Sequence, residues 1–414
     1  MTHLATESIL KYFDIKDNQL LIGGRTCEDI DREVGTPFYA YDLSVAKRKL
    51  QMLRDALPAE VQIHYAIKAN PNPDILSFFY EKGTGFDVAS ASELKAVLDT
   101  GADPDSIGFA GPGKREYELR LACKARIGSL NAESVDELEL ANRIAGQENE
   151  KLKVSLRVNP AYELVGSGMK MGGGSKQFGI DQEKIPDVLK RFKHWQNLEF
   201  VGFHIFAGSQ NLRVESILSA FKHALDTVVS FLSICPKYPK VINLGGGFGI
   251  PYYADNDELE IIAVGHGISQ YLKKYQNELK SIKLNVETGR YLVGECGVYV
   301  CRVLYKKVSR GETFLVLDGG MHHHLSASGN FGQIIKRNFP ICIPGKINHT
   351  SKEVVNIVGP LCTPLDRLGT KVELPEVYSG ELVAFLGSGA YAFSASPKAF
   401  LSHPAPAEVI LSSC

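Results

Sequence analysis

Short apolar segments alternate with amphipathic stretches between about residue 37 and about residue 290. Helical periodicity lies between the apolar segments, as in Ser92–Asp99 and Val214–Leu232. This alternation is typical of parallel βαβ units, and the number of repeats favours a (β/α)8 TIM-type barrel over an open sheet. We predict its strands at Val61–Ile67, Gly85–Val88, Ile107–Phe109, Lys153–Val158, Glu199–Phe206, Val241–Leu244 and Lys283–Val286.

The pattern changes after about residue 290, where helical periodicity becomes scarce. Strand-like segments separated by turn residues follow at Gly297–Tyr305, Thr313–Leu317, Glu353–Val358 and Glu381–Phe385. They predict an antiparallel β-barrel or sandwich domain that also takes in an N-terminal strand near Gln19–Ile22. The predicted division is an N-terminal segment (1–36), a barrel (37–290) and a C-terminal β domain (291–414).

Composition narrows the class of protein. Of the 414 residues, 44% are hydrophobic and 22% are charged, which is enough to bury a large core and excludes a disordered chain. The formal net charge of -1 disfavours nucleic-acid binding, which depends on neutralising phosphates. The 8 cysteines are scattered, and the sequence starts without a signal-peptide pattern and carries no evident membrane span. We therefore expect reduced thiols in a cytoplasmic protein with no membrane or nucleic-acid partner.

Lys68 ends the apolar run that starts at His64, and Pro71 stops the strand shortly after it. The lysine is therefore predicted at the carboxyl end of a barrel strand, where barrel enzymes carry their active sites. An amine in that position can form an imine with an aldehyde cofactor. The ordinary alternative is a lysine whose stem is buried and whose charge reaches water.

Two further motifs follow predicted strands. The run Gly245–Gly249 can present backbone N–H groups to a phosphate, although a tight turn explains it equally well. In Glu287-Thr288-Gly289-Arg290 the carboxylate could keep a pyridine nitrogen protonated and the guanidinium could clamp a phosphate, whereas a plain salt bridge is the alternative.

Three other segments are less specific. Gly166–Gly174 is a glycine-rich loop of the kind that forms lids or mobile surface loops. The triplet His322–His324 is not expected to bind a metal, because neighbouring residues on a strand point to opposite faces. Cys362 can return a proton to a carbanion beside a cofactor, but an inert cysteine is the commoner case.

The order and spacing of these motifs resemble the fold-type III decarboxylases that depend on pyridoxal 5'-phosphate (PLP), the family of diaminopimelate and ornithine decarboxylases. The segments that carry the resemblance span nearly the whole chain: Tyr65–Asn70, Phe86–Ser90, Gly245–Gly247, Glu287–Arg290, Gly359–Cys362 and Gly389–Tyr391.

The resemblance implies a role for each matching residue. Lys68 would carry the cofactor as a Schiff base, Glu287 would face its ring nitrogen, and Cys362 would act as a proton donor supplied by the second protomer of a homodimer. Further cofactor contacts would come from Asp87, Ala89, Glu93, Arg157, Phe206, Ser209, Gly245, Gly246, Gly247, Gly289, Arg290 and Tyr391. Substrate contacts would come from Cys362, Asp366, His324 and Asn330. A carboxylate at the ring nitrogen favours decarboxylation over racemisation, because it keeps the ring a strong electron acceptor.

Three departures from the family pattern bear on the substrate. Phe206 stands where the family has a ring-stacking histidine, with His204 two residues earlier. Thr363 stands where diaminopimelate decarboxylases have a glutamate that reads the distal amino group. The arginine expected after Asp318–Met321, for a distal carboxylate, is absent.

These segments instead resemble a subgroup that includes exosortase-associated decarboxylases and decarboxylases of glutamyl groups carried on an acyl carrier protein. The leading hypothesis is PLP-dependent decarboxylation of an L-amino acid or amino-acyl conjugate. The alternatives are a diaminopimelate decarboxylase that forms L-lysine, an amino-acid racemase, a PLP-homeostasis protein and a non-catalytic regulatory homologue.

Overall fold

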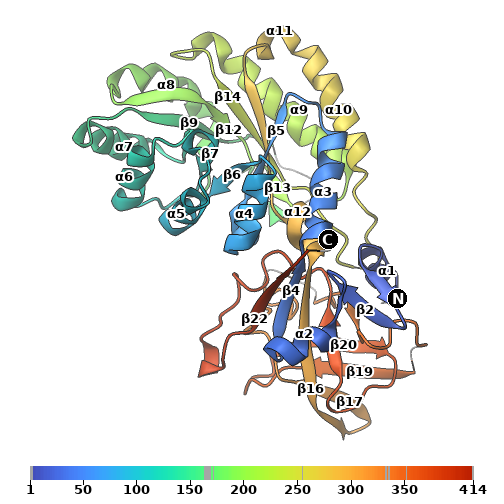
Figure 1. Ribbon diagram of the computed structural model, residues 1–414. Coiled ribbons are helices and arrows are strands. Elements are labelled where there is room, and N and C mark those ends of the chain that lie inside the picture. Colours follow the sequence, from blue (N-terminus) through green and yellow to red (C-terminus); the bar gives the residue numbers. More distant parts are fainter. Residues whose placement is uncertain are drawn as a thin grey trace. The chain divides into compact units, whose positions relative to one another are not determined.

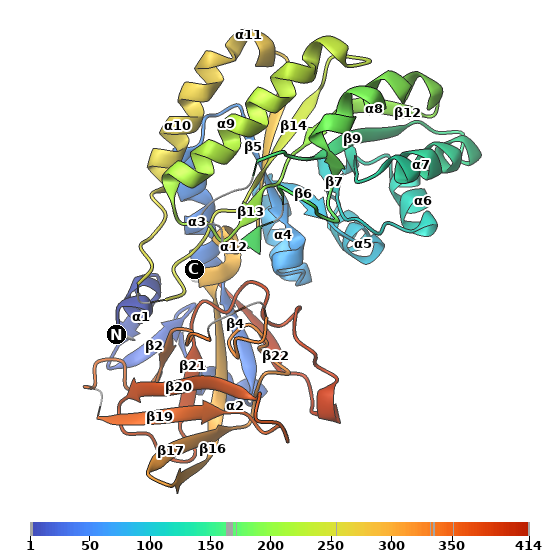
Figure 2. The ribbon, with the colours of Figure 1, turned by 180° about the vertical axis from the view of Figure 1, so that it is seen from behind.

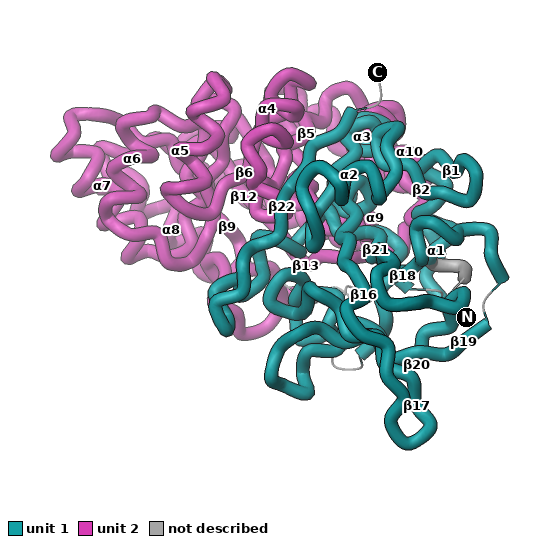
Figure 3. Tube along the Cα trace, turned by 60° about the horizontal axis from the view of Figure 1, so that its bottom comes forward, with its two compact units in different colours: residues 1–50, 250–258, 290–414 teal, residues 51–249, 259–289 magenta. Residues whose placement is uncertain are grey.

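The computed structural model describes residues 3–162, 169–170, 172–253, 255–331, 333, 336–350 and 352–412. The chain forms two compact units (Figure 3). Unit 1 takes in residues 1–50, 250–258 and 290–414, and unit 2 takes in residues 51–249 and 259–289. The units differ from the predicted division at residues 37–50, 250–258 and 290, which group with unit 1.

Unit 2 contains a closed barrel of eight parallel strands, as predicted. The order is β9-β12-β14-β15-β5-β6-β7-β8, and β8 pairs back with β9. The strands are β5 (Val61–Ala66), β6 (Gly85–Val88), β7 (Ile107–Phe109), β8 (Ser129–Ala132), β9 (Leu152–Asn159), β12 (Leu198–His204), β14 (Val241–Gly246) and β15 (Lys283–Thr288). Seven of them coincide with predicted segments, and β8 was missed.

Helices surround these strands in unit 2 (Figures 1 and 2). They are α4 (Pro73–Glu81), α5 (Ala91–Asp99), α6 (Glu116–Ala125), α7 (Val135–Gln147), α8 (Ile185–Arg191), α9 (Val214–Phe231), α10 (Ile261–Lys274) and α11 (Gln276–Leu279), and α3 (Leu43–Ala56) runs from unit 1 into unit 2. By length and composition the stretch Val214–Ile234 could cross a membrane. Its buried residues, however, recur every three or four positions, among them Ile217, Phe221, Leu225 and Val228. That spacing is the stripe of a helix packed on a core.

The barrel strands have one apolar and one polar face. In β15, Leu284 and Val286 alternate with Lys283, Asn285 and Glu287. Alternate residues of a strand point to opposite faces, so the apolar residues meet the helices and the polar ones point into the barrel. Strand β8 follows the same rule with inward Ser129 and Asn131, which explains why its sequence lacks an apolar run.

Unit 1 is built on an eight-stranded sheet in the order β18-β21-β16-β17-β19-β20, with β4 paired to β16 and β22 paired to β4. The strands are β4 (Phe38–Asp42), β16 (Gly297–Ser309), β17 (Glu312–Leu317), β18 (Ile341–Cys342), β19 (Glu353–Val358), β20 (Arg367–Leu374), β21 (Leu382–Phe385) and β22 (Ala407–Leu411), alongside the helices α1 (His3–Leu10), α2 (Cys27–Val34) and α12 (Arg290–Val293).

The sheet of unit 1 is mixed, which corrects the predicted antiparallel domain. The pairs β17–β19 and β4–β22 are parallel. A long connection separates β17 from β19 and lets the chain return in the same direction, which a hairpin does not allow. The N-terminal strand that joins the sheet is β4, whereas Gln19–Ile22 forms β2 in a separate three-stranded sheet with β1 (Asp14–Lys16) and β3 (Arg25–Thr26).

Gly202 marks a close approach between β12 and β14. A Cβ atom at this position would lie 1.7 Å from the carbonyl oxygen of Val241. Gly202→Ala is therefore expected to lower the free energy of unfolding by about 1–3 kcal/mol, because the two strands must move apart. Urea denaturation measures the loss. The control is Gly113→Ala, whose Cβ would meet nothing within 4 Å; equal losses in the two variants would contradict the argument.

Candidate active site

Lys68 lies in a short 3-10 turn, Ile67–Ala69, directly after β5. Its Nζ atom is 3.4 Å from Oδ2 of Asp87, the third residue of β6, and 5.9 Å from the ring centre of Phe206. The lysine side chain is 37% exposed, whereas that of Asp87 is 1% exposed. The amine is therefore held by a buried carboxylate while it remains open to a ligand at the carboxyl end of the barrel, as predicted from its strand position.

Asp87 is a buried acid with unused hydrogen-bonding capacity. Its Oδ1 atom has no hydrogen-bond partner among the described residues. Burial and the nearby charge of Glu287 raise the pKa of Asp87, and Lys68 opposes that shift. Glu93, in the first turn of α5, is tied to the same end of the barrel, since its Oε2 accepts the N–H of Ala89 at 2.6 Å.

Glu287 lies near the end of β15 and is 5% exposed. Its Oε1 atom is 2.8 Å from Nε2 of His204 and 2.6 Å from Nδ2 of Asn243. Burial raises the pKa of Glu287, but His204, Lys68 and Arg157 together lower it well below its usual range. The carboxylate is consequently ionised in the barrel interior. The sequence motifs include His204 but do not link it to this carboxylate, and Asn243 belongs to none of them.

Arg157 is fixed by a buried ion pair whose acidic partner lies in no motif of the sequence. Its NH1 atom is 2.6 Å from Oε1 of Glu133, and its guanidinium lies 4.8 Å from the ring centre of Phe178. Glu133 also accepts the N–H groups of Gly111 and Gly179, each at 2.8 Å. The predicted cofactor residue is thus held in one orientation.

The glycines at the carboxyl end of β14 bring the backbone close to its neighbours. Gly245 and Gly247 have φ values of +65° and +85°, which side chains rarely adopt, and a Cβ at Gly246 would lie 1.7 Å from the carbonyl oxygen of Glu287. Ser209 lies in β13 (Gly208–Ser209), which pairs with β10 (Met169–Lys170). Of the predicted loop Gly166–Gly174, residues 166–168 and 171 lie outside the described residues.

These residues of unit 2 fit pyridoxal phosphate. An accessible amine suits its aldehyde, an ionised buried carboxylate suits a protonated ring nitrogen, and a glycine turn without side chains suits a phosphate. Lys68, Asp87, Glu287 and Gly245–Gly247 all lie at or near the carboxyl ends of neighbouring parallel strands, so the fold brings together what the sequence separates.

Two further predicted cofactor residues, Arg290 and Tyr391, belong to unit 1. The NH1 atom of Arg290 lies 3.0 Å from the hydroxyl of Tyr252, and its guanidinium lies 4.6 Å from the ring centre of Tyr391. Gly289, the last residue of unit 2, packs closely, since a Cβ there would meet Ala69 at 2.6 Å. The role of Arg290 and Tyr391 in cofactor binding stays a prediction.

Two of the predicted substrate residues are committed to contacts within unit 1. The carboxylate of Asp366 is buried and accepts the N–H groups of Met321 and Leu361. His324 is fully buried, with one ring nitrogen 2.9 Å from the Ser388 hydroxyl and the other accepting the N–H of Ala327. These bonds give both side chains a structural role and leave their predicted substrate contacts without support.

The other two predicted substrate residues reach the surface or the adjoining loop. Cys362 is exposed. Asn330 donates to the Ser328 hydroxyl and to the carbonyl of Leu365. Among the described residues, no three His, Cys, Asp or Glu side chains gather as a metal site would require.

The Glu133–Arg157 pair should make stability depend on pH. Burial raises the pKa of Glu133, but Arg157 and Lys114 lower it more, so the net shift is downward. A lowered pKa in the folded state adds stability above the unfolded pKa of about 4.3, and this stability is lost as the pH falls through the folded value. Glu133→Gln should therefore lose about 3–5 kcal/mol at pH 7, and less in acid.

Urea unfolding of both proteins at pH 7 and near pH 3.5 measures this difference. The control is Glu139→Gln, which breaks a half-exposed pair with Arg191. Its effect should stay under about 1 kcal/mol. A Glu133→Gln deficit of the same size at both pH values would show that the carboxylate does not contribute as an ion.

Comparison with known proteins agrees with this geometry. Residues 43–294 match the family described as pyridoxal-dependent decarboxylase, pyridoxal binding domain. The L-glutamyl-[BtrI acyl-carrier protein] decarboxylase of Niallia circulans is 38% identical over 91% of this chain and 88% of its own length. The diaminopimelate decarboxylase of Aquifex aeolicus is 31% identical over 97% of this chain and 92% of its own length.

Solved structures show the same fold. The diaminopimelate decarboxylase of M. jannaschii, crystallised with L-lysine, aligns with a TM-score of 0.90 at 26% identity, over 98% of this chain and 93% of that chain.

Proposed function

Because the chain belongs to the pyridoxal-dependent decarboxylases of fold type III, we propose that it decarboxylates an L-amino acid extended at its distal end, such as a glutamyl group on an acyl carrier protein. The observation that carries the proposal is the segment Cys362–Leu365 of unit 1, in which Thr363 is half-buried and the other three residues are exposed. It holds no charged side chain, and the next residue, Asp366, uses its carboxylate on backbone N–H groups.

A free diamino acid has a charged distal end that needs a partner. Leaving a charged group unpaired forfeits hydrogen bonds worth about 1.5–3 kcal/mol each. The segment Cys362–Leu365 offers no carboxylate for such a group. A substrate whose distal carboxyl is bonded to a carrier has no charge at that position and needs no charged partner there. The relative from Niallia circulans is named for a substrate of that kind.

The residues of unit 2 would divide the chemistry among them. Lys68 would bind the cofactor through its amine, with Asp87 orienting that amine, and Phe206 would offer an apolar ring surface. Glu287 would hold a proton at the ring nitrogen. The bound cofactor supplies an acceptor for the electron pair left when CO2 departs. Cys362 would return a proton to the substrate carbon.

The proposal includes a homodimer in the cytoplasm. Cys362 is exposed on unit 1, which is the arrangement expected of a side chain that serves a neighbouring protomer. Shared sites of this kind occur twice in a symmetric pair. Both the dimer and the compartment stay predictions.

Lys68→Ala should abolish the visible absorption that purified protein shows after loading with PLP, because it removes the amine that would bond to the aldehyde of the cofactor. The control is Lys95→Ala, an exposed lysine of α5 that should leave the spectrum unchanged. Absorption spectra of the two variants after dialysis measure the difference. A visible band retained by Lys68→Ala would reject Lys68 as the attachment point.

Release of CO2 should be fast with a glutamyl-loaded acyl carrier protein and slow with free diaminopimelate, lysine, ornithine, arginine and glutamate. The expected preference in kcat/KM over each free amino acid is roughly tenfold or more, since one lost charged contact is worth that much. Rapid release from diaminopimelate would instead favour the second candidate, a diaminopimelate decarboxylase, which the 31% identity with the Aquifex aeolicus enzyme supports.

A further inference from the structure

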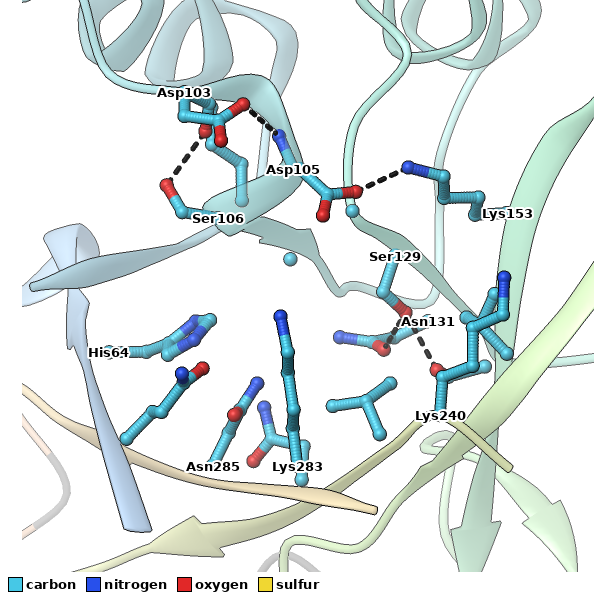
Figure 4. A pocket seen from close by; sticks show the side chains of 18 residues that line it. His64, Asp103, Asp105, Ser106, Ser129, Asn131, Lys153, Lys240, Lys283 and Asn285 are labelled. Carbon is cyan, nitrogen blue, oxygen red and sulfur yellow. Dashed lines mark hydrogen bonds and ion pairs between the residues drawn. The ribbon is translucent and has the colours of Figure 1, made fainter. Parts of the chain in front are cut away.

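A cavity opens at the amino-terminal end of the barrel, opposite the end that carries Lys68. Its volume is about 330 Å³, and Figure 4 shows the polar side chains that point into it. Lys153 and Lys283 lie at the starts of their strands and border the opening, and Lys153 pairs with Asp105 across the rim. The inner wall is formed by His64, Ser129, Asn131, Ser155, Asn243 and Asn285.

The polar lining of this amino-terminal cavity is unusual for a barrel. Barrel interiors are ordinarily filled by layers of bulky apolar side chains. Here the second inward layer consists of amides, hydroxyls and one imidazole. Its side chains satisfy one another only in part: the Ser129 hydroxyl lies 3.1 Å from Oδ1 of Asn131 and 2.7 Å from the Ser155 hydroxyl, whereas other amide atoms of the layer have no such partner. A buried amide atom without a hydrogen bond is costly.

Two buried side-chain atoms of the cavity wall are left without a hydrogen bond. Nδ2 of Asn131 and Oδ1 of Asn285 are buried, and neither has a hydrogen-bond partner among the described residues. Asn131 is 2% exposed and Asn285 is 7% exposed. Both residues line the cavity, which has room for on the order of ten waters. Ordered water is therefore the partner that this geometry calls for.

The wall of the cavity also reaches the buried carboxylate of the site. Asn243 lines the cavity and donates to Oε1 of Glu287 at 2.6 Å. His64 lines it as well and lies opposite Glu287 in the register of β5 and β15. Burial lowers the pKa of His64, which the charge of Glu287 partly opposes. The carboxylate thus has polar neighbours on its amino-terminal side, beyond His204.

We propose that this cavity is a hydrated passage through which the Glu287–His204 pair exchanges protons with bulk water at the amino-terminal end of the barrel. The pair then keeps contact with solvent while a cofactor and substrate cover the opposite end. Asn243 and His64 act as positioning residues, because they hold water against the carboxylate. The passage is a property of the folded chain, and it stands whichever substrate the enzyme takes.

The test blocks the passage in full-length, PLP-loaded protein. Asn285→Leu puts an apolar side chain of similar size into the inner layer. Lys283→Met is the matched control, because it removes a rim charge at nearly constant length and leaves the inner layer polar. The readout is the exchange rate of the His204 ring N–H with water, followed by NMR on 15N-histidine-labelled protein and assigned with a His204→Gln variant.

Exchange should slow about tenfold or more in Asn285→Leu, because it would then need a local opening of the barrel, and it should be unchanged in Lys283→Met. Equal rates in wild type and Asn285→Leu would overturn the proposal. If Asn285→Leu does not fold, Asn131→Leu is the second variant that fills the inner layer with an apolar side chain.

A crystal structure of the wild type gives an independent result. Waters bonded to Asn131 Nδ2 and Asn285 Oδ1 would support the passage, and a cavity without water would refute it. Neither readout involves turnover, so each is independent of the proposed substrate.

Discussion

The carboxylate of Glu287 lies inside the barrel, where an isolated ion is far less stable than in water. Its charge persists because His204 and Asn243 contact one oxygen and because Lys68 and Arg157 lie near enough to lower its pKa. Arg157 is itself a buried ion and requires Glu133, which in turn takes two backbone N–H groups. Keeping one buried carboxylate ionised therefore requires several other side chains, from several strands, to stay in fixed positions.

The space for these polar side chains comes from glycine. A Cβ at Gly85 would lie 2.5 Å from Nε2 of His64, so the imidazole of β5 occupies the volume that a side chain on β6 would take. At Gly246 a Cβ would meet the backbone of Glu287 at 1.7 Å. These glycines let neighbouring strands approach closely enough for the inward polar groups to contact one another. The close packing of the backbone at these glycines is thus what allows the polar contacts that keep the carboxylate of Glu287 ionised.

The sequence predicted the barrel well because its outward strand faces are apolar. The bounds of β6 and β7 were predicted without error, and motifs that follow strands were placed correctly at the carboxyl end of the barrel. Glu133 directly follows β8, the strand that was not predicted, whereas Asn243 and His64 lie on predicted strands and were missed for a physical reason. In a closed barrel both faces of a strand are buried, so alternation alone does not reveal that the polar face is the interior. The pairing of strands in unit 1 could not be predicted from the sequence either, because two parallel strands joined by a long connection have no sequence pattern that marks them as partners.

Under the proposed function, most of the chemistry falls in one unit and the proposed distal contacts of the substrate fall in the other, with Cys362 as the exception. Lys68, Asp87 and Glu287 belong to unit 2, whereas Cys362–Asp366 belongs to unit 1. Each unit is stabilised by its own core, so a substitution at Thr363 or Leu365 leaves the network around Glu287 intact. Conversely, Asp366 is held by Met321 and Leu361 within unit 1 and can stay in place while the exposed residues before it change. Under the proposed function, a shared decarboxylation site can therefore accompany different distal groups, which agrees with relatives at 31% and 38% identity that are named for different substrates.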